Sequence, residues 1–278
     1  MKKISRRSFL AAAGLSVAAL ALTACGGSAS SVASSVASSA SSAAASTSAA
    51  AGELTTVEAG KLTMATNAAF PPYEMTTDAG EFEGIDIETA QAIADKLGLE
   101  LQIDDMDFDA ALLSVQQGKA DIVMAGVTVT DERKAVMDFS DSYATGIQSI
   151  IVPEGSDIAS PDDLAGKKIG TQRGTTGYIY CSDDFGDENV VAYDNGLTAV
   201  QALTNGQVDA VVIDNAPAKE FVAANPGLVI LDTSYAEEDY AIGLAKGSAL
   251  EDAVNAALEE LKADGTLQSI VDKYITAE

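Results

Sequence analysis

An internal repeat is the feature of this sequence that most restricts its fold. Residues 111–121, ALLSVQQGKAD, are matched 88 residues later by residues 199–209, AVQALTNGQVD. Each copy predicts an apolar helix face that ends at a glycine, followed by an aspartate and a hydrophobic strand. Any helix–glycine–strand unit shares this register, but here polar residues also follow both strands, at 125–128 and at Asp214. Ligands bind beyond the carboxyl ends of strands in open α/β sheets, so the repeat predicts two related lobes that face one cleft.

Strand and helix patterns alternate through the rest of the chain from about residue 57. Apolar runs bounded by polar or turn residues predict strands at 61–66, 99–103, 122–125, 148–152, 168–171, 190–193, 210–213 and 228–231. Helical spacing of apolar residues predicts helices at 85–97, 109–117, 175–182, 197–204, 216–224, 248–263 and 265–275. This order predicts an α/β fold of mostly parallel strands covered by crossover helices.

Residues 1–24 predict a signal peptide. A basic start precedes an apolar run, residues 9–22, that is too short for a comfortable membrane span. The ending LTAC, residues 22–25, resembles the bacterial lipobox, which implies cleavage before Cys25 and attachment of a lipid to its sulfur. An uncleaved anchor and an ordinary signal peptide are the alternatives. Arg6 and Arg7 resemble the twin-arginine export signal, and a general secretory signal remains the other interpretation.

The segment after Cys25 predicts a tether. Residues 26–52 contain only Gly, Ser, Ala, Val and Thr, without charge or hydrophobic periodicity. Such a segment cannot bury enough apolar surface to offset the entropy lost on ordering. We therefore expect residues 25–52 to hold the folded part outside the cell membrane, on its outer face, through the lipid on Cys25.

Composition excludes several classes of function. The chain has no histidine, which rules out Ser–His and Cys–His nucleophiles and histidine-containing metal sites. The formal net charge is −26, and removal of the basic first segment brings it to about −30, which argues against nucleic acid as a partner. With Cys25 lipidated, Cys181 is left alone, so we expect no disulfide and a packing role for Cys181.

Seven short stretches in order resemble the periplasmic amino-acid-binding proteins that bind glutamine, histidine or lysine, arginine and ornithine. They are LTMATNAAFPPY (62–73), GIDI (84–87), DF (107–108), AGVTVTDERK (125–134), DFS (138–140), GTQRGTT (170–176) and VDAVVID (208–214). The resemblance covers about residues 57–276. It implies a type II periplasmic-binding-protein fold with one lobe at 57–147 plus 240–278 and the other at 148–239. A two-strand hinge would cross near 146–149 and 239–242.

The resemblance also implies the substrate-binding component of an ABC importer, without enzymatic activity, cofactor or metal. The expected partners are a free amino acid and a permease in the cytoplasmic membrane, and the expected state is a monomer. An enzyme on the same fold, similar to cyclohexadienyl dehydratases, is the main alternative. It would need a general acid or base, for which only Asp214 or Glu74 is available. A ligand-sensing module is a third interpretation.

Two charged residues fit the two charges that every free amino acid carries. Arg133 is expected to bind the α-carboxylate, because its planar guanidinium can reach both oxygens. The alternative is an exposed arginine at a helix start that pairs with Asp131. Asp214 is expected to bind the α-ammonium, since a buried charge without a partner is costly. An N-cap role for the helix beginning near Ala216 is compatible with this.

The family resemblance implies further contacts around these two charges. The hydroxyl of Thr128 and backbone groups near Gly126 and Thr176 would assist Arg133, and a carbonyl at Ala125 or Gly126 would assist Asp214. Phe70 and Phe108 match the aromatic pair that encloses the ligand side chain, with ordinary core packing as the alternative. The full predicted set is Asn67, Phe70, Phe108, Ala125, Gly126, Thr128, Arg133, Gln172, Thr176 and Asp214.

The ligand side chain is expected to be polar and uncharged, or acidic. Relatives that bind cationic or amide side chains often have an acidic residue at the place of Asn67, which is neutral here. Gln172 and Arg173 fall where the second lobe would meet the ligand tail, and Arg173 would attract an acidic one. The acidic runs at 183–184 and 237–239 predict solvated loops, with a calcium site as the alternative.

Overall fold

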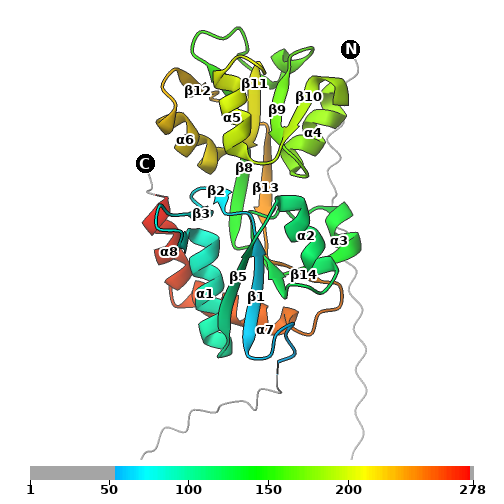
Figure 1. Cartoon of the computed structure of the whole chain (residues 1–278), viewed down its shortest axis with the longest axis vertical. Coiled ribbons are helices and arrows are strands. Elements are labelled where there is room, and N and C mark those ends of the chain that lie inside the picture. The colour runs from blue at the N-terminus through cyan, green and yellow to red at the C-terminus, as the bar shows by residue number, and fades with distance from the viewer. Residues whose placement is uncertain (1–53, 276–278) are drawn as a thin grey trace, which may run out of the picture. The chain divides into compact units, whose positions relative to one another are not determined.

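The computed structural model describes residues 54–275, which belong to one structural unit built on two principal β-sheets (Figure 1). The predicted signal peptide, Cys25 and the whole of the predicted tether lie outside the described residues. Each sheet carries helices on both faces, which gives the predicted two-lobed α/β fold.

The first sheet has the strand order β5-β1-β6-β14-β7. Its strands are β1 (Lys61–Thr66), β5 (Glu100–Asp105), β6 (Ile122–Val123), β7 (Met137–Phe139) and β14 (Gly243–Ala245). Its helices are α1 (Ile85–Leu97), α2 (Phe108–Gln116), α3 (Asp131–Val136), α7 (Glu251–Ala263) and α8 (Thr266–Tyr274). Helices α1, α7 and α8 pack against one another, whereas α2 packs on β1 and β14. Alternation along β1 explains this division, since Leu62 and Met64 belong to one hydrophobic cluster and Ala65 to another.

The second sheet has the order β10-β9-β11-β8-β12, and β13 also pairs with β8. Its strands are β8 (Ala144–Pro153), β9 (Ile169–Gln172), β10 (Val190–Tyr193), β11 (Ala210–Asp214), β12 (Leu228–Ile230) and β13 (Ala236–Tyr240). Its helices are α4 (Thr176–Phe185), α5 (Gly196–Thr204), α6 (Asn215–Ala224) and the short 3-10 turns η1 (Pro161–Leu164) and η2 (Asp187–Asn189). Cys181 of α4 is fully buried in the cluster that this helix forms with the sheet, in keeping with a packing role.

Both sheets are mixed rather than mostly parallel. The strands joined by crossover helices, such as β1 and β5 or β9 and β10, are parallel as predicted. Strands β8 and β14 run antiparallel to their neighbours β11 and β6. β8 carries the chain into the second sheet and β14 follows its return, so neither strand is reached through a crossover helix.

The chain passes between the two sheets in β8 and returns in β13. These strands pair antiparallel, with Gly146 opposite Glu238, and Figure 1 shows them side by side between the two groups of helices. The predicted hinge segments at 146–149 and 239–242 overlap this pair. The acidic run at 237–239 is not a solvated loop, since it lies in β13 and alternates, with Glu237 and Asp239 exposed and Glu238 buried.

The two copies of the repeat have the same local structure. Gly118 after α2 and Gly206 after α5 both have left-handed backbones, with φ of 65° and 67°. Asp121 and Asp209 then accept the backbone N–H of Thr63 in β1 and of Lys168 just before β9, each at 2.8 Å. Asp121 thus holds the start of β6 next to β1, and Asp209 holds the start of β11 next to β9.

The sequence patterns did not predict α3, β7, β14 or a small third sheet. It contains β2 (Ala69–Phe70), β3 (Glu74–Thr76) and β4 (Phe82–Glu83), which are too short for any periodicity to be recognised. This sheet places Phe70 and Glu74 beside the end of β1. Within residues 54–275, no helix is long and apolar enough to cross a membrane.

Candidate ligand-binding site

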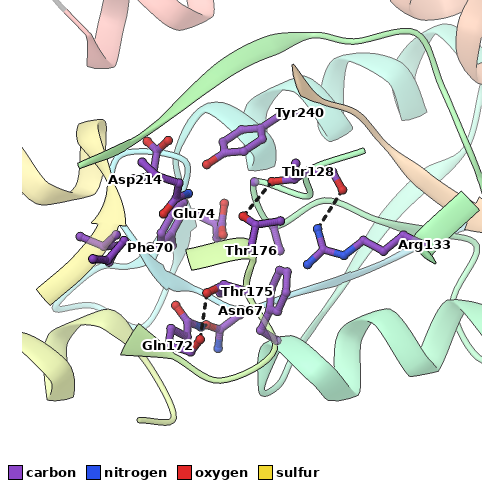
Figure 2. Close-up of a pocket in the computed structure, with 16 residues that line it drawn as sticks. Asn67, Phe70, Glu74, Thr128, Arg133, Gln172, Thr175, Thr176, Asp214 and Tyr240 are labelled. Carbon is purple, nitrogen blue, oxygen red and sulfur yellow. Dashed lines mark hydrogen bonds between the residues drawn. The ribbon is translucent and has the colours of Figure 1, made fainter. Parts of the chain in front are cut away.

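A pocket between the two lobes contains all ten residues of the predicted ligand-binding set. The ten predicted residues that line it are Asn67, Phe70, Phe108, Ala125, Gly126, Thr128, Arg133, Gln172, Thr176 and Asp214 (Figure 2). Six further residues that line it are Glu74, Gln148, Thr175, Val212, Ile213 and Tyr240. Many of them lie at or just beyond the carboxyl ends of strands, as Asn67 does after β1, Gln172 on β9 and Asp214 on β11.

Arg133 reaches the pocket from the short helix α3. The hydroxyl oxygen of Thr130 caps this helix by accepting the Arg133 backbone N–H at 3.2 Å. The guanidinium donates through Nη1 to the Thr128 carbonyl at 2.8 Å and through Nη2 to the Gly174 carbonyl at 3.1 Å. It also lies 5.4 Å from the centre of the Phe108 ring, a cation–π distance. Arg133 is therefore held in place by neutral groups.

The charge of Arg133 has no carboxylate in direct contact. The side chain is only 8% exposed, and none of the ion pairs found within residues 54–275 includes it. The alternative pairing with Asp131 is thus not present. Burial lowers the pKa of Arg133, although a guanidinium stays charged at neutral pH. A buried cation of this kind is suited to an anionic group of a ligand.

Asp214 lies at the opposite end of the pocket from Arg133 (Figure 2). Its Oδ1 accepts the Ala216 backbone N–H at 3.1 Å and its Oδ2 accepts that of Ile147 at 2.7 Å. Asp214 therefore caps α6, as the alternative interpretation proposed, and also lines the pocket. Burial raises the pKa of Asp214 to about 6, partly offset by these donors and by the Tyr240 hydroxyl. A ligand cation would favour the ionised form.

Aromatic rings enclose the space beside Gly126. Phe70 stacks with Tyr73 at 5.9 Å, and Tyr73 meets Tyr240 edge to face at 5.4 Å. Gly126 has a φ of 55°, and a Cβ there would come within 3.0 Å of Phe70 and 3.1 Å of Tyr240. Only glycine fits this position, which brings the backbone of Gly126 directly to the pocket wall.

Asn67 and Gln172 join the two lobes through their amides. Gln172 Nε2 donates to Asn67 Oδ1 at 2.9 Å, and Asn67 Nδ2 donates to the Met106 carbonyl at 2.9 Å. With the bond from Arg133 to Gly174, this contact crosses from one lobe to the other. The structure thus shows the lobes closed on each other.

Glu74 is a buried carboxyl that the sequence analysis considered only as a possible catalyst. It is 1% exposed, and neither oxygen accepts a hydrogen bond from the described N–H and O–H donors. Burial and the neighbouring Asp86 carboxylate raise the pKa of Glu74 well above its usual value. Burial also raises the pKa of Asp86 to about 6, although its Oδ2 accepts the Gly126 N–H at 3.0 Å. The closed pocket therefore favours the protonated form of Glu74.

Arg173 does not reach the pocket, contrary to the expectation that it would attract an acidic ligand tail. Its side chain is 57% exposed and lies 4.0 Å from Asp194. The turn after β9 explains the difference, since adjacent side chains there point in different directions and Gln172 is the one that faces inward. The pocket therefore contains one arginine and the carboxyl groups of Glu74 and Asp214.

Sequence reasoning missed six lining residues, and three of them lie within two residues of predicted ones, namely Thr175, Val212 and Ile213. Tyr240 and Gln148 lie on the strands that connect the lobes, and no local pattern marks such strands as pocket walls. Glu74 lies four residues after the predicted ligand aromatic Phe70, and this proximity was the available signal. Within the described part of the chain, no group of three or more acidic or cysteine side chains is arranged to hold a metal ion.

Comparisons with known proteins agree with this geometry. The family model for bacterial extracellular solute-binding proteins, family 3, matches residues 62–277. The probable histidine-binding protein of Neisseria gonorrhoeae is 33% identical over 275 residues, covering 96% of this chain and 95% of the relative. The L-cystine-binding protein TcyJ of Escherichia coli (strain K12) is 33% identical over 226 residues, covering 80% and 85%.

A solved structure with the same fold is an ancestral arginine-binding protein bound to glutamine. It is 42% identical, with a TM-score of 0.75, and the match covers 78% of this chain and 99% of that one. These similarities confirm the predicted two-lobed fold and the prediction of a binding protein rather than an enzyme.

Proposed function

The chain belongs to the bacterial extracellular solute-binding proteins of family 3 and is the amino-acid-binding component of an ABC transporter, and we propose that it holds a free amino acid between Arg133 and Asp214. The buried guanidinium of Arg133, which has no carboxylate partner among residues 54–275, carries this proposal. The α-carboxylate would bind Arg133, and the α-ammonium would bind Asp214. Two opposite charges at the two ends of one pocket match a zwitterion.

Capture would occur by closure of the lobes about the strands β8 and β13. Arg133 and Asn67 belong to the first lobe, and Gly174 and Gln172 to the second, so contacts on both sides of the ligand need the closed arrangement. A ligand that contacts both lobes shifts the balance toward the closed form.

The ligand side chain is proposed to be polar and uncharged, with an amide as the best fit. A protonated Glu74 can donate to an amide oxygen, and Gln172 and Asn67 offer amide groups on the other side. The acidic ligand that the sequence also suggested is disfavoured, because Arg173 lies outside the pocket and Glu74 lies in it. A cationic side chain would require Glu74 to release its proton.

Replacement of Arg133 by alanine tests the proposal. We expect Arg133→Ala to weaken amino-acid binding at least about a hundredfold, since loss of one partner of a buried charge pair costs about 3–5 kcal/mol. The exposed neighbour Lys134 provides the matched control, and Lys134→Ala should bind normally. A thermal-shift screen of the common amino acids identifies the ligand, and calorimetry measures the two variants. Near-native affinity in Arg133→Ala would contradict the assigned carboxylate site.

We further propose that the protein is a monomer tethered to the outer face of the cell membrane through a lipid on Cys25. The sequence LTAC and the tether at 25–52 support the anchor, and a pocket formed by one chain supports the monomer. The permease in the same membrane would then meet the protein at short range. In cells, Cys25→Ala should release the protein from the membrane fraction, and retention of the variant there would argue against lipidation.

A further inference from the structure

A buried carboxylate lies behind the pocket, on the strand by which the chain returns to the first lobe. Glu238 of β13 is 7% exposed, whereas Glu237 and Asp239 on either side of it are exposed. No ion pair within residues 54–275 includes Glu238. An ionised group without a paired cation needs hydrogen-bond donors to offset its desolvation.

Three side chains donate to a single oxygen of Glu238. Its Oε2 accepts the Thr128 hydroxyl at 3.1 Å, the Thr176 hydroxyl at 3.0 Å and Gln148 Nε2 at 3.0 Å. Bonds to an ionised acceptor are stronger than bonds between neutral groups. This set of contacts is the largest that any pocket-side carboxylate makes with side chains of the described residues.

The three donors come from three different parts of the fold. Thr128 follows β6 in the first lobe, Thr176 begins α4 in the second lobe, and Gln148 lies on the connecting strand β8. The Thr128 and Thr176 hydroxyl oxygens are 3.4 Å apart, and Figure 2 shows these two side chains next to each other, joined by a dashed line. Separation of the lobes would move one of these hydroxyls away from Glu238. Both bonds can therefore exist only in the closed arrangement.

Thr128 and Thr176 also line the pocket. Glu238 therefore sets the direction in which their hydroxyl groups face a ligand. A hydroxyl has one proton, and donation to Glu238 fixes its direction and leaves its lone pairs free. Thr128 is further tied to Arg133, whose Nη1 donates to the Thr128 carbonyl. Glu238 thus acts on the ligand through groups that it holds, without lining the pocket itself.

We propose that Glu238 is a positioning residue that favours closure of the lobes and orients the Thr128 and Thr176 hydroxyls. This inference rests on the proposed function, because it describes how the same pocket closes around an amino acid. It assigns a role to a residue that contacts neither end of the ligand.

The test compares Glu238→Ala, Glu238→Gln and the control Glu237→Ala, the last on an exposed residue of the same strand. We expect Glu238→Ala to speed ligand dissociation about 10- to 100-fold, with a much smaller effect on association. Glu238→Gln keeps an acceptor oxygen and should show only a few-fold effect, by the same reasoning. Stopped-flow measurements with the amino acid found in the screen give both rates.

A second measurement does not depend on knowing the ligand. Small-angle X-ray scattering of the ligand-free proteins should give a larger radius of gyration for Glu238→Ala than for wild type and Glu237→Ala. Thr176→Val removes one donor from the second lobe and should change scattering and dissociation in the same direction, which keeps the test valid if Glu238→Ala folds poorly.

The outcomes separate the inference from the proposed function. Unchanged dissociation and scattering in Glu238→Ala and Thr176→Val would overturn the role of Glu238 in closure, even if Arg133→Ala loses binding as expected. A lower melting temperature without any change in dissociation or scattering would assign Glu238 a purely structural role, which also overturns it. Normal binding by Arg133→Ala would instead overturn the proposed carboxylate site. The scattering of the ligand-free proteins would still test whether Glu238 favours closure.

Discussion

Replacement of Asp214 by asparagine should make the ligand-free protein more stable and at the same time nearly abolish amino-acid binding. Asp214 is 2% exposed, and none of the ion pairs found within residues 54–275 includes it, so its charge is poorly stabilised until an ammonium binds. Asparagine has the same shape and keeps one oxygen to accept from Ala216 or Ile147. It removes the charge and leaves most of the packing intact.

The expected magnitudes follow from the pKa of Asp214. A rise from 3.8 to about 6 corresponds to about 3 kcal/mol of preference for the neutral form in the folded protein. Asp214→Asn also loses one hydrogen bond from a backbone N–H to the charged group, which reduces the gain in stability by about 1–2 kcal/mol. The net gain of about 1–2 kcal/mol should raise the melting temperature by roughly 4 °C in a chain of this size. Loss of the ammonium's counter-charge should weaken binding by about 2–5 kcal/mol, or roughly 30- to 5,000-fold.

The pH dependence of the stability difference provides the sharpest test. The folded state binds more protons than the unfolded state between the two pKa values, so the cost of ionising Asp214 is complete above about pH 6 and absent below about pH 4. The advantage of Asp214→Asn in thermal unfolding should therefore be present at about pH 7 and disappear at about pH 4. An asparagine variant that is less stable than wild type at neutral pH would refute the reasoning, as would binding within threefold of wild type by calorimetry.

Three further predictions concern the same pocket. Amino-acid affinity should fall about tenfold per pH unit below pH 6 as Asp214 takes up a proton, and calorimetry that finds constant affinity between about pH 5 and 8 would contradict this. Asn67→Asp should raise the affinity for cationic amino acids relative to amide amino acids at least about tenfold in competition assays, because it adds a carboxylate beside the ligand side chain. An unchanged ratio of affinities would show that the ligand side chain lies elsewhere. Gly146→Ala should lower the free energy of unfolding by about 1–3 kcal/mol and weaken binding, because its Cβ would lie 2.5 Å from Cζ of the pocket residue Tyr240. A denaturant unfolding curve that matches wild type would contradict this, since it would show that β8 moves to accommodate the methyl group without cost.

The repeated units could be predicted from sequence because their signals are local. The helix face, the capping glycine and the aspartate all lie within a segment of eleven residues. Both copies, at 111–121 and 199–209, have the predicted structure. The residues after the strands could then be assigned to one pocket edge by a general rule of α/β sheets. Asp214 was assigned in this way, whereas Arg133 was assigned from the planar shape of its guanidinium, and the family resemblance selected between the alternatives for both.

The connecting strands could not be predicted in the same way. β13 contains three acidic residues in a row, and its alternation between Glu237 and Glu238 is visible only once β8 pairs with it. Arg173 and Gln172 are neighbours in sequence, and only the turn geometry after β9 decides which of the two faces the pocket. Contacts that depend on pairing between distant segments leave no local pattern to read.

The position of β14 has a consequence for the order in which the chain folds. β14 lies between β6 and β7 in the first sheet, although about a hundred residues separate it from either strand in sequence. During synthesis the first sheet therefore stays split until residues 243–245 have emerged, whereas all strands of the second sheet lie within 144–240. Pairings over such long separations form slowly, because a large loop must close first. We expect the second lobe to reach its folded structure while β6 and β7 still have an unpaired edge, and that edge is where aggregation or chaperone binding would begin.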